Sequence, residues 1–219
     1  MAFALVLVGG LALAALPEGA NIESETDEGE FPGISSESID VTDGHVYNTD
    51  LNTTMSTYRW SGIYGNVSGN IVLSDDDSDV LYDWSAQGRL VYASESTPDW
   101  SALTDATENN VTAAYPHIGN ADSDNYSTTF TGASESVDSG IYTSLSSDYA
   151  QTYDNETTAT WKTYSLQDAS SNIVFAGLVQ QGGAASYKGS IVDYQMIVPE
   201  DGTEGDDSAT TYNLYAELQ

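Results

Sequence analysis

The sequence predicts a mainly β protein, an antiparallel β-sandwich domain preceded by an apolar N-terminal segment. Apolar and polar side chains alternate with a period of two through much of the chain, and no helical stripe of useful length follows residue 44. Polar turns separate roughly nine or ten short strands, a pattern typical of antiparallel sandwiches. We therefore divide the chain into an apolar assembly segment (1–16), an acidic linker (17–44) and a β-sandwich domain (45–219).

The assembly segment reads MAFALVLVGGLALAAL and carries no charge. As a helix it would span about 24 Å, short of the roughly 30 Å apolar core of a bilayer. An ordered segment of this kind must be buried, and neighbouring copies that bury each other's segments would form a polymer. We expect a helix in a filament core, with a strand donated to the next subunit's sheet as the alternative. The expected subunit-interface residues are the large apolar side chains Phe3, Leu5, Val6, Leu7, Val8, Leu11, Leu13 and Leu16.

A signal-peptide core is another interpretation of this segment, but no basic residue precedes the apolar run. We expect instead that a short basic leader is removed upstream of Met1. The next stretch, residues 17–44, holds nine acidic and no basic residues, which predicts an extended linker.

Strands are expected wherever short apolar or alternating runs are bounded by turn residues. Residues 71–73 and 80–84 flank an acidic stretch and predict a hairpin. Further strands are expected at 89–94, 126–131, 158–166 and 172–180. The clearest alternation gives one apolar face at Val192, Tyr194, Met196 and Val198, and another at Tyr212, Leu214, Ala216 and Leu218.

The charge balance excludes some partners. The chain has 34 acidic residues against Arg59, Arg89, Lys162 and Lys188, a formal net charge of −30. Such a charge repels nucleic acid and anionic lipid. It also opposes compaction of the chain in dilute buffer, and high salt screens this repulsion. The charge balance therefore indicates a very salty habitat. Fifteen Tyr and four Trp supply enough apolar surface to oppose disorder. Cysteine is absent, so the chain has no disulfide and no thiolate metal site.

No motif points to catalysis, a metal site or a cofactor. The two histidines, His45 and His117, lie in polar, turn-like surroundings without partners at a suitable spacing. The acidic run 75–79 lacks the EF-hand pattern, since Val80 replaces the glycine and Ala86 the terminal acid. Phosphate-cradling loops, GxSxG and HExxH are absent. We predict that the protein is not an enzyme.

Surface sugars are the expected modification. N-glycosylation sequons occur at Asn52, Asn66, Asn110, Asn125 and Asn155. The aromatic residues offer a different interpretation, because Trp60, Tyr64 and Asn66 share one face of an expected strand and could form a glycan-binding face. Tyrosine is also an ordinary strand former, and we expect Trp60 to anchor the core instead.

The run from Trp60 to Leu73 resembles the W-x-G-x-Y-G-N-V-S-G-x-I-x-L pattern of a family of archaeal exported surface proteins. Residues 80–84, 91–94, 99–101, 193–202 and 212–218 continue the similarity, which covers most of 57–219 but matches 103–157 poorly. The resemblance implies an archaeal origin and surface location, and brings no catalytic residues. The N-terminal segment separately resembles that of archaeal type IV pilins, although it is short and ends at Pro17.

Together these patterns predict a structural subunit of an extracellular, pilus-like filament on the surface of a halophilic archaeon. Its partners would be copies of itself and covalent glycans, with transient membrane association before assembly. A monomeric surface module for glycan binding or adhesion is the alternative.

Overall fold

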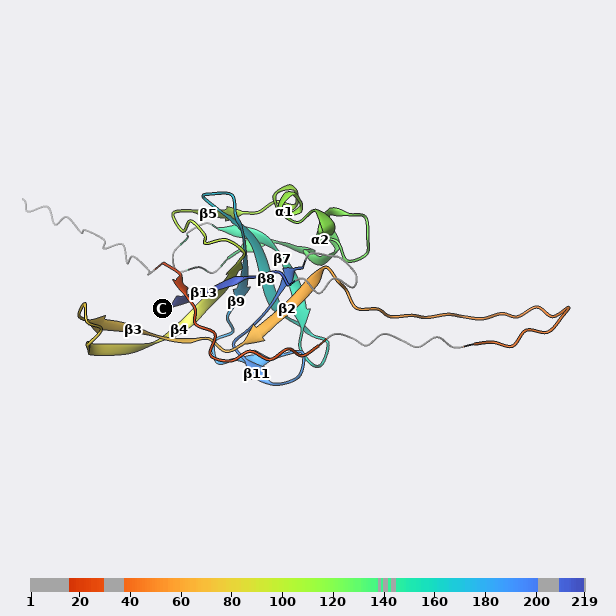
Figure 1. The fold of residues 1–219 in the computed structure, drawn as a ribbon, viewed down its shortest axis with the longest axis horizontal. Helices are drawn as coiled ribbons and strands as arrows, with labels where there is room; N and C mark the ends of the chain where they lie inside the picture. Colours follow the sequence, from red (N-terminus) through yellow and green to blue (C-terminus); the bar gives the residue numbers. More distant parts are fainter. Residues whose placement is uncertain are drawn as a thin grey trace, which may run out of the picture.

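The largest element of the fold is an antiparallel sheet of nine strands (Figure 1). The computed structural model describes residues 16–29, 38–137, 139, 142, 145–200 and 209–218, with 43% strand and 8% helix. The order across the sheet is β1 (Glu18–Gly19), β13 (Asn213–Leu218), β4 (Val80–Ser94), β9 (Ile173–Leu178), β8 (Ala159–Asp168), β7 (Ser146–Tyr153) and β6 (Gly132–Ser136). Outside this order, β3 (Ser68–Ser74) pairs with β4 and β5 (Leu103–Asp105) with β8. A mainly β fold with a large antiparallel sheet is confirmed.

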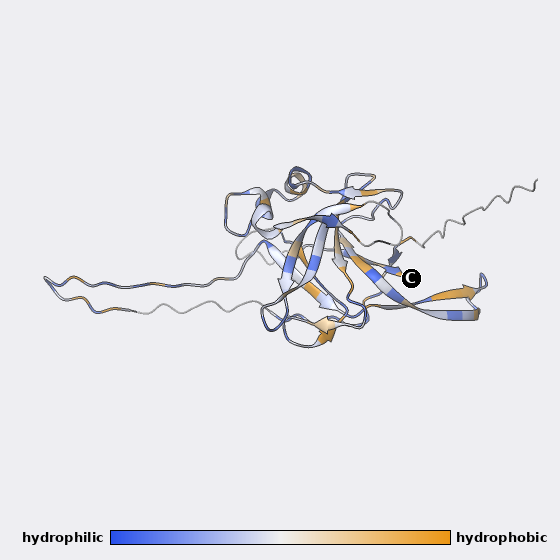
Figure 2. Cartoon of the chain, turned by 180° about the vertical axis from the view of Figure 1, so that it is seen from behind, coloured by the Kyte–Doolittle hydropathy of each residue, from blue (hydrophilic) through white to orange (hydrophobic). Residues whose placement is uncertain are grey.

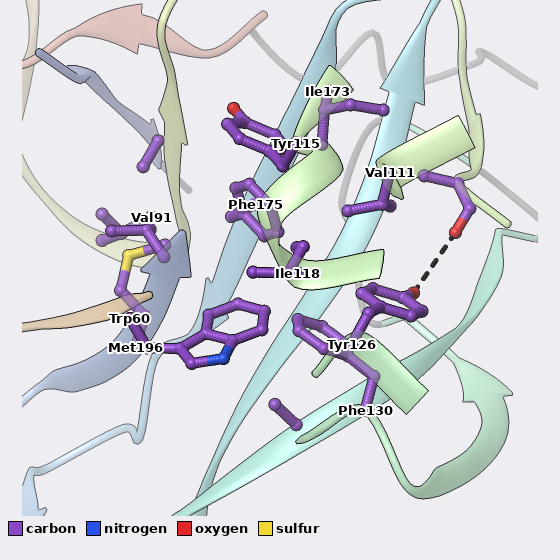
Figure 3. Close-up of a cluster of buried hydrophobic side chains, with 14 of the residues drawn as sticks. Trp60, Val91, Val111, Tyr115, Ile118, Tyr126, Phe130, Ile173, Phe175 and Met196 are labelled. Carbon is purple, nitrogen blue, oxygen red and sulfur yellow. Dashed lines mark hydrogen bonds between the residues drawn. The ribbon is translucent and has the colours of Figure 1, made fainter. Parts of the chain in front are cut away.

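A smaller layer covers one face of this sheet. It consists of the ribbon β2 (Trp60–Gly65) and β12 (Tyr194–Pro199) and of the short helices α1 (Glu108–Ala114), η1 (Pro116–Gly119) and α2 (Tyr126–Thr129). Trp60 and Met196 from the ribbon, Ile118 and Phe130 from the helical region and Phe175 from β9 meet in one buried cluster (Figure 3). Within the described residues the second layer is this ribbon with its helices, so the predicted second large sheet is not confirmed. A further pair, β10 (Ala184–Ala185) and β11 (Ile191–Val192), lies outside both.

The opposite face of the main sheet is buried as well. Side chains alternate along a strand, so Val91 of β4 joins the first cluster while Leu90 and Tyr92 join a second one with Tyr164 and Val174. None of these side chains is more than 3% exposed. The sheet is therefore the common wall of two cores, and its central strands need apolar residues on both faces.

Most of the strands expected from alternation are present. The predicted hairpin exists as β3 and β4, joined by the acidic turn, and the strand predicted at 89–94 is the second half of β4. The strands predicted at 158–166 and 172–180 are β8 and β9. The run 191–198 forms β11 and β12, interrupted at Asp193, and its predicted apolar face is buried. The last predicted strand is β13.

The strand predicted at 126–131 is wrong, because residues 126–129 form helix α2. Asn125 caps this helix, accepting a hydrogen bond from the backbone N–H of Thr128 at 2.9 Å. One turn apart, the rings of Tyr126 and Phe130 stack with centroids 4.7 Å from each other. The strand-like pattern of residues 126–131 is therefore coincidental. The Asn125 cap and the stacked rings of Tyr126 and Phe130 stabilise a helix instead.

Strand β13 is buried on both faces rather than on the predicted one. Tyr212 and Leu214 pack against the first core as expected, but Tyr215 packs against the second. Glu217 is only 1% exposed and accepts a hydrogen bond from the Tyr92 hydroxyl at 2.9 Å. Burial, reinforced by the Glu217 carboxylate, raises the pKa of Tyr92, which keeps this hydroxyl a donor. Both faces of β13 are covered because the two cores extend over it on opposite sides of the sheet.

Three hairpin turns share one construction based on aspartate. Asp75, Asp154 and Asp168 each end a strand or begin the turn, and one carboxylate oxygen accepts the backbone N–H groups two and four residues later at 2.8–3.1 Å. In each turn the residue three positions later, Ser78, Thr157 or Ser171, has a φ between 66° and 71°. The carboxylate thus supplies an acceptor for turn N–H groups that the strand ladders leave unpaired.

The Asp168 carboxylate accepts further hydrogen bonds, which affect its pKa. It also accepts the backbone N–H of Asp99 at 2.7 Å and the amide of Asn172 at 2.8 Å, which ties the β8–β9 turn to the loop after β4. Burial acts to raise the pKa of Asp168, but these hydrogen bonds outweigh it and hold the pKa below its usual value. The charged carboxylate is therefore the stabilising form.

Replacing Ser171 with glycine tests the cost of the positive φ in this turn. We expect Ser171→Gly to stabilise the fold by about 1 kcal/mol, because glycine adopts the left-handed region without the Cβ clash. Ser170→Gly is the matched control; its φ is not positive, so added chain entropy should lower stability by about 0.5–1 kcal/mol. Urea unfolding midpoints measure both. Equal effects of the two substitutions would show that the Ser171 backbone carries no strain.

Candidate functional site

The β3–β4 hairpin projects from the body (Figure 1), and Figure 2 colours part of it as hydrophobic. Its apolar side chains are exposed to solvent. These side chains are 45–78% exposed: Ile71, Val72, Leu73, Val80, Leu81, Tyr82 and Trp84. Apolar surface gathered on one projecting element, on a chain of net charge −30, is typical of an interaction site. Sequence reasoning predicted these strands but not their exposure, because an unbroken apolar run is also the pattern of a buried strand.

One face of the hairpin is a continuous apolar patch. Ile71 lies directly opposite Trp84, and Leu73 directly opposite Tyr82, so all four share a face. The rings of Tyr82 and Trp84 are in contact, with centroids 4.8 Å apart. On the other face Val72 lies opposite Asp83. The hairpin therefore offers apolar side chains on both faces with a single acid among them.

Within the described residues, both outer edges of the hairpin are unpaired. β4 pairs with β13 only from Gly88 onward and with β9 only from Leu90 onward. β3 pairs with β4 alone. Unpaired backbone N–H and C=O groups at such an edge are a template for a further strand.

Strand β1, which follows the N-terminal segment in sequence, lies close to the base of this hairpin. Glu18 pairs with Ala216 and Gly19 with Tyr215, so β1 forms an edge of the main sheet. Pro17 is buried, whereas Leu16 is half exposed. The other predicted interface residues (Phe3, Leu5, Val6, Leu7, Val8, Leu11 and Leu13) lie outside the described residues, and so does the predicted helix.

Residues 38–57 form a long exposed arm that leads to β2 (Figure 1). The Val46 and Leu51 side chains on this arm are 100% and 93% exposed. The arm reaches the body at Thr57, whose hydroxyl donates to the Asp124 carboxylate at 2.7 Å. These isolated apolar residues are useful controls for the clustered ones on the hairpin.

Three of the four basic residues join elements that are distant in sequence. Arg59, at the start of β2, pairs with Asp122 at 2.5 Å and with Asp124. Although burial acts to raise the pKa of Asp124, hydrogen bonds from Thr57 and Arg59 hold it below its usual value. The indole N–H of Trp60 donates to the Asp124 backbone carbonyl at 2.6 Å, which completes this joint.

The two lysines form similar joints. Lys162 of β8 pairs with Glu135 of β6 at 2.6 Å and lies 4.5 Å from the Tyr149 ring centroid. Lys188 pairs with Glu28, and this hydrogen bond raises the pKa of Lys188 and lowers that of Glu28. The second contact fastens the acidic N-terminal stretch to the loop between β10 and β11.

The residues weighed for a glycan-binding face are not presented together. Trp60 is 7% exposed and lies in the first core, so its predicted anchoring role is confirmed. Tyr64 donates to Glu28 at 3.0 Å and packs edge-on against Tyr187 at 5.3 Å. Asn66 is exposed just beyond the end of β2. A flat sugar platform formed by Trp60, Tyr64 and Asn66 is therefore excluded by the burial of Trp60.

The other sequence candidates lie apart from one another. His45 stacks on Tyr47 in the exposed arm, and His117 lies in η1 beside Tyr115. Among the described residues no cluster of three or more potential metal ligands is found. The Asp75 carboxylate in the acidic run is engaged by turn N–H groups, as described above.

Two depressions on the described surface have volumes of about 160 and 60 Å³. Ligand pockets usually have volumes of about 300–1,000 Å³. The larger depression is lined mainly by polar residues near Tyr115 and Asn172. The exposed hairpin is therefore the most distinctive candidate site on this surface.

Comparison with known proteins gives no match to any family model, to any curated protein or to any solved structure. The resemblance to archaeal surface proteins and to type IV pilins accordingly stays a prediction. None of the helices in the described part of the chain has the length and hydropathy needed to cross a membrane.

The five sequons differ in their surroundings. Asn52, Asn66 and Asn155 are exposed, whereas Asn110 and Asn125 are half-buried. The Asn125 side chain caps α2 and donates from its amide nitrogen to the Asn120 carbonyl at 2.9 Å. The Asn110 side chain accepts from the Thr107 backbone at 3.1 Å in a capping box.

In an exported, glycosylated form of the chain we expect sugars at Asn52, Asn66 and Asn155 only. At Asn110 and Asn125 a glycan would have to fit beside side-chain atoms already engaged in helix caps. Mass spectrometry of glycopeptides from the native protein measures the occupancy of each sequon. Full occupancy of Asn125 together with an empty Asn66 would contradict this prediction.

Proposed function

We propose that the protein is a structural subunit of an extracellular, pilus-like filament of a halophilic archaeon, assembled through residues 1–16. The observation that carries the proposal is the separation of charge from apolar surface. Two parts of this acidic chain are rich in apolar residues and poor in charge: the segment 1–16, which has none, and the paired strands of the projecting β3–β4 hairpin, whose exposed apolar side chains are accompanied only by Asp83. Both would be costly for a monomer to expose, since each large apolar side chain is worth about 1.5–3 kcal/mol on burial.

The acidic body suits such a polymer in a salty medium. Like charges spread over the surface keep copies from aggregating at random, while high salt screens their repulsion at close range. Three of the four basic residues are engaged in joints within the body. Association between copies would then depend on apolar contacts and strand pairing, which salt does not screen.

Deleting residues 1–16 tests the assembly role. We expect the truncated protein to keep its circular dichroism spectrum and unfolding midpoint, because β1 and its pairing with β13 are retained. It should form no filaments when it is imaged by electron microscopy at high salt. Leu51→Asp in the full chain, a change at a fully exposed apolar residue of the arm, is the control and should leave filaments intact. Filaments of normal form without residues 1–16 would disprove the proposal.

Salt dependence tests the proposed habitat. The melting temperature should rise between dilute buffer and about 1 M KCl, because the screening length falls to about 3 Å and the repulsion among 34 acids weakens. Sucrose of equal osmolarity is the control, since it favours burial without screening charge, and its effect should be smaller. A melting temperature that falls over this range would argue against a halophilic origin.

A further inference from the structure

The outer edge of β3 is an open position in the main sheet. Strand β13 pairs with β4 as far as Gly88, and β3 pairs with β4 from Gln87 onward. A Cβ built on Gly69 would lie only 2.6 Å from the Leu218 Cδ1 atom. The start of β3 is therefore next to the end of β13. Figures 1 and 2 show the same arrangement from opposite sides, with the C-terminal end beside the base of the hairpin. β3 thus continues the line of β13 along β4. The outer edge of β13 is paired with β1, but among the described residues no strand pairs with the outer edge of β3.

The chemistry of this edge matches the segment 1–16. One face of the hairpin is apolar, with Ile71, Leu73 and Trp84, and on the other face Val72 lies on β3 itself, opposite Asp83 of β4. In residues 3–8, Phe-Ala-Leu-Val-Leu-Val, both alternating sets of side chains are apolar and none is charged. A strand with two apolar faces added beside β3 would cover Ile71 and Leu73 on one face and Val72 on the other, and its backbone would pair the open edge.

The subunit's own segment is badly placed for this pairing. β1 runs antiparallel to β13, so a strand continued upstream from Leu16 in the same line would run alongside the hairpin. β3 is seven residues long, and a strand continued from Leu16 would use roughly residues 9–15 along it. That register would leave residues 1–8, the most apolar and most strand-favouring half, beyond the acidic turn at residues 75–79. A second copy has no such restriction and can set residues 3–8 against β3.

We infer that the outer edge of β3 (Ser68–Ser74) is the acceptor site for the N-terminal segment of a second copy, which adds as an antiparallel strand. This inference rests on the proposed function and specifies its contact: residues 3–8 of one subunit complete the sheet of the next. Fifteen extended residues span about 50 Å, so the donor reaches well clear of its own body. The N-terminal segment is then a donated strand rather than a core helix.

Cysteine trapping in the full-length protein tests this contact, because the chain has no cysteine of its own. Leu5→Cys and Val6→Cys place a thiol on either face of the donor, and Leu73→Cys places one on the acceptor. Donor and acceptor proteins are mixed at molar KCl under mild oxidation, and linked peptides are identified by mass spectrometry. Leu51→Cys is the control acceptor, equally apolar and 93% exposed but on the arm.

We expect donor cysteines to link to position 73 about ten-fold more than to position 51, because a disulfide needs Cα atoms within about 7 Å. In a parallel experiment, Leu73→Asp should abolish filaments while preserving the circular dichroism spectrum, and Leu51→Asp should not. Wild-type filaments with no preference for position 73 would overturn the acceptor site and leave the proposed function standing.

Three other results would also overturn the inference. Links within one chain carrying both a donor cysteine and Leu73→Cys, without links between chains, would show that each subunit binds its own segment. Dominant links between two copies of position 73 would make the hairpin pair with itself. Filaments that persist after deletion of residues 1–16 would remove the proposed function and this contact together.

Discussion

Cohesion in this fold depends on one sheet that is buried on both faces, inside a chain whose net charge of −30 opposes compaction. The strands β4, β8 and β9 carry the largest fully buried side chains, among them Tyr92, Trp161 and Phe175. Apolar burial is worth about 25 cal/mol per Å² and does not depend on charge, so it can offset repulsion that ion pairs are too few to balance. The ion pairs of Arg59, Lys162 and Lys188 join elements that are distant in sequence.

The acidic residues repel one another, but some of them also stabilise the fold. In the turns at Asp75, Asp154 and Asp168, a carboxylate accepts two backbone N–H groups and so substitutes for the glycine-based turns common in hairpins. The cost is a serine or threonine at positive φ in each turn. Hydrogen bonds from several donors stabilise the ionised carboxylate, which is why the pKa of Asp168 is depressed despite its burial. Inside the second core, Glu217 accepts hydrogen bonds from the Tyr92 and Ser139 hydroxyls.

The sequence pattern located the strands that bury one or both faces: Val192 to Val198 alternates clearly, and β8 and β9 are runs bounded by turn residues. It missed β6 and β7, because these strands are rich in serine and other polar residues and show little alternation of hydropathy. It also missed α1 and misread α2, because these short helices are decided by the caps at Thr107 and Asn125. The exposure of the β3–β4 hairpin was beyond prediction, because a fully apolar strand gives no sign of whether protein or solvent surrounds it.

That exposure is the feature that most needs a physical reason. A hairpin with free edges and apolar faces is an aggregation hazard, which natural sheets usually avoid with charges or prolines at the edge. Here the acids lie at the tip, in the turn at residues 75–79, and only Asp83 lies within the paired part. Charge at the tip limits end-on contact between hairpins while leaving the side of β3 open. In a salty medium, screening would weaken an interface built on ion pairs, whereas strand pairing and apolar burial would keep their strength. An acidic subunit that assembles through uncharged strands is therefore the arrangement that such a medium favours.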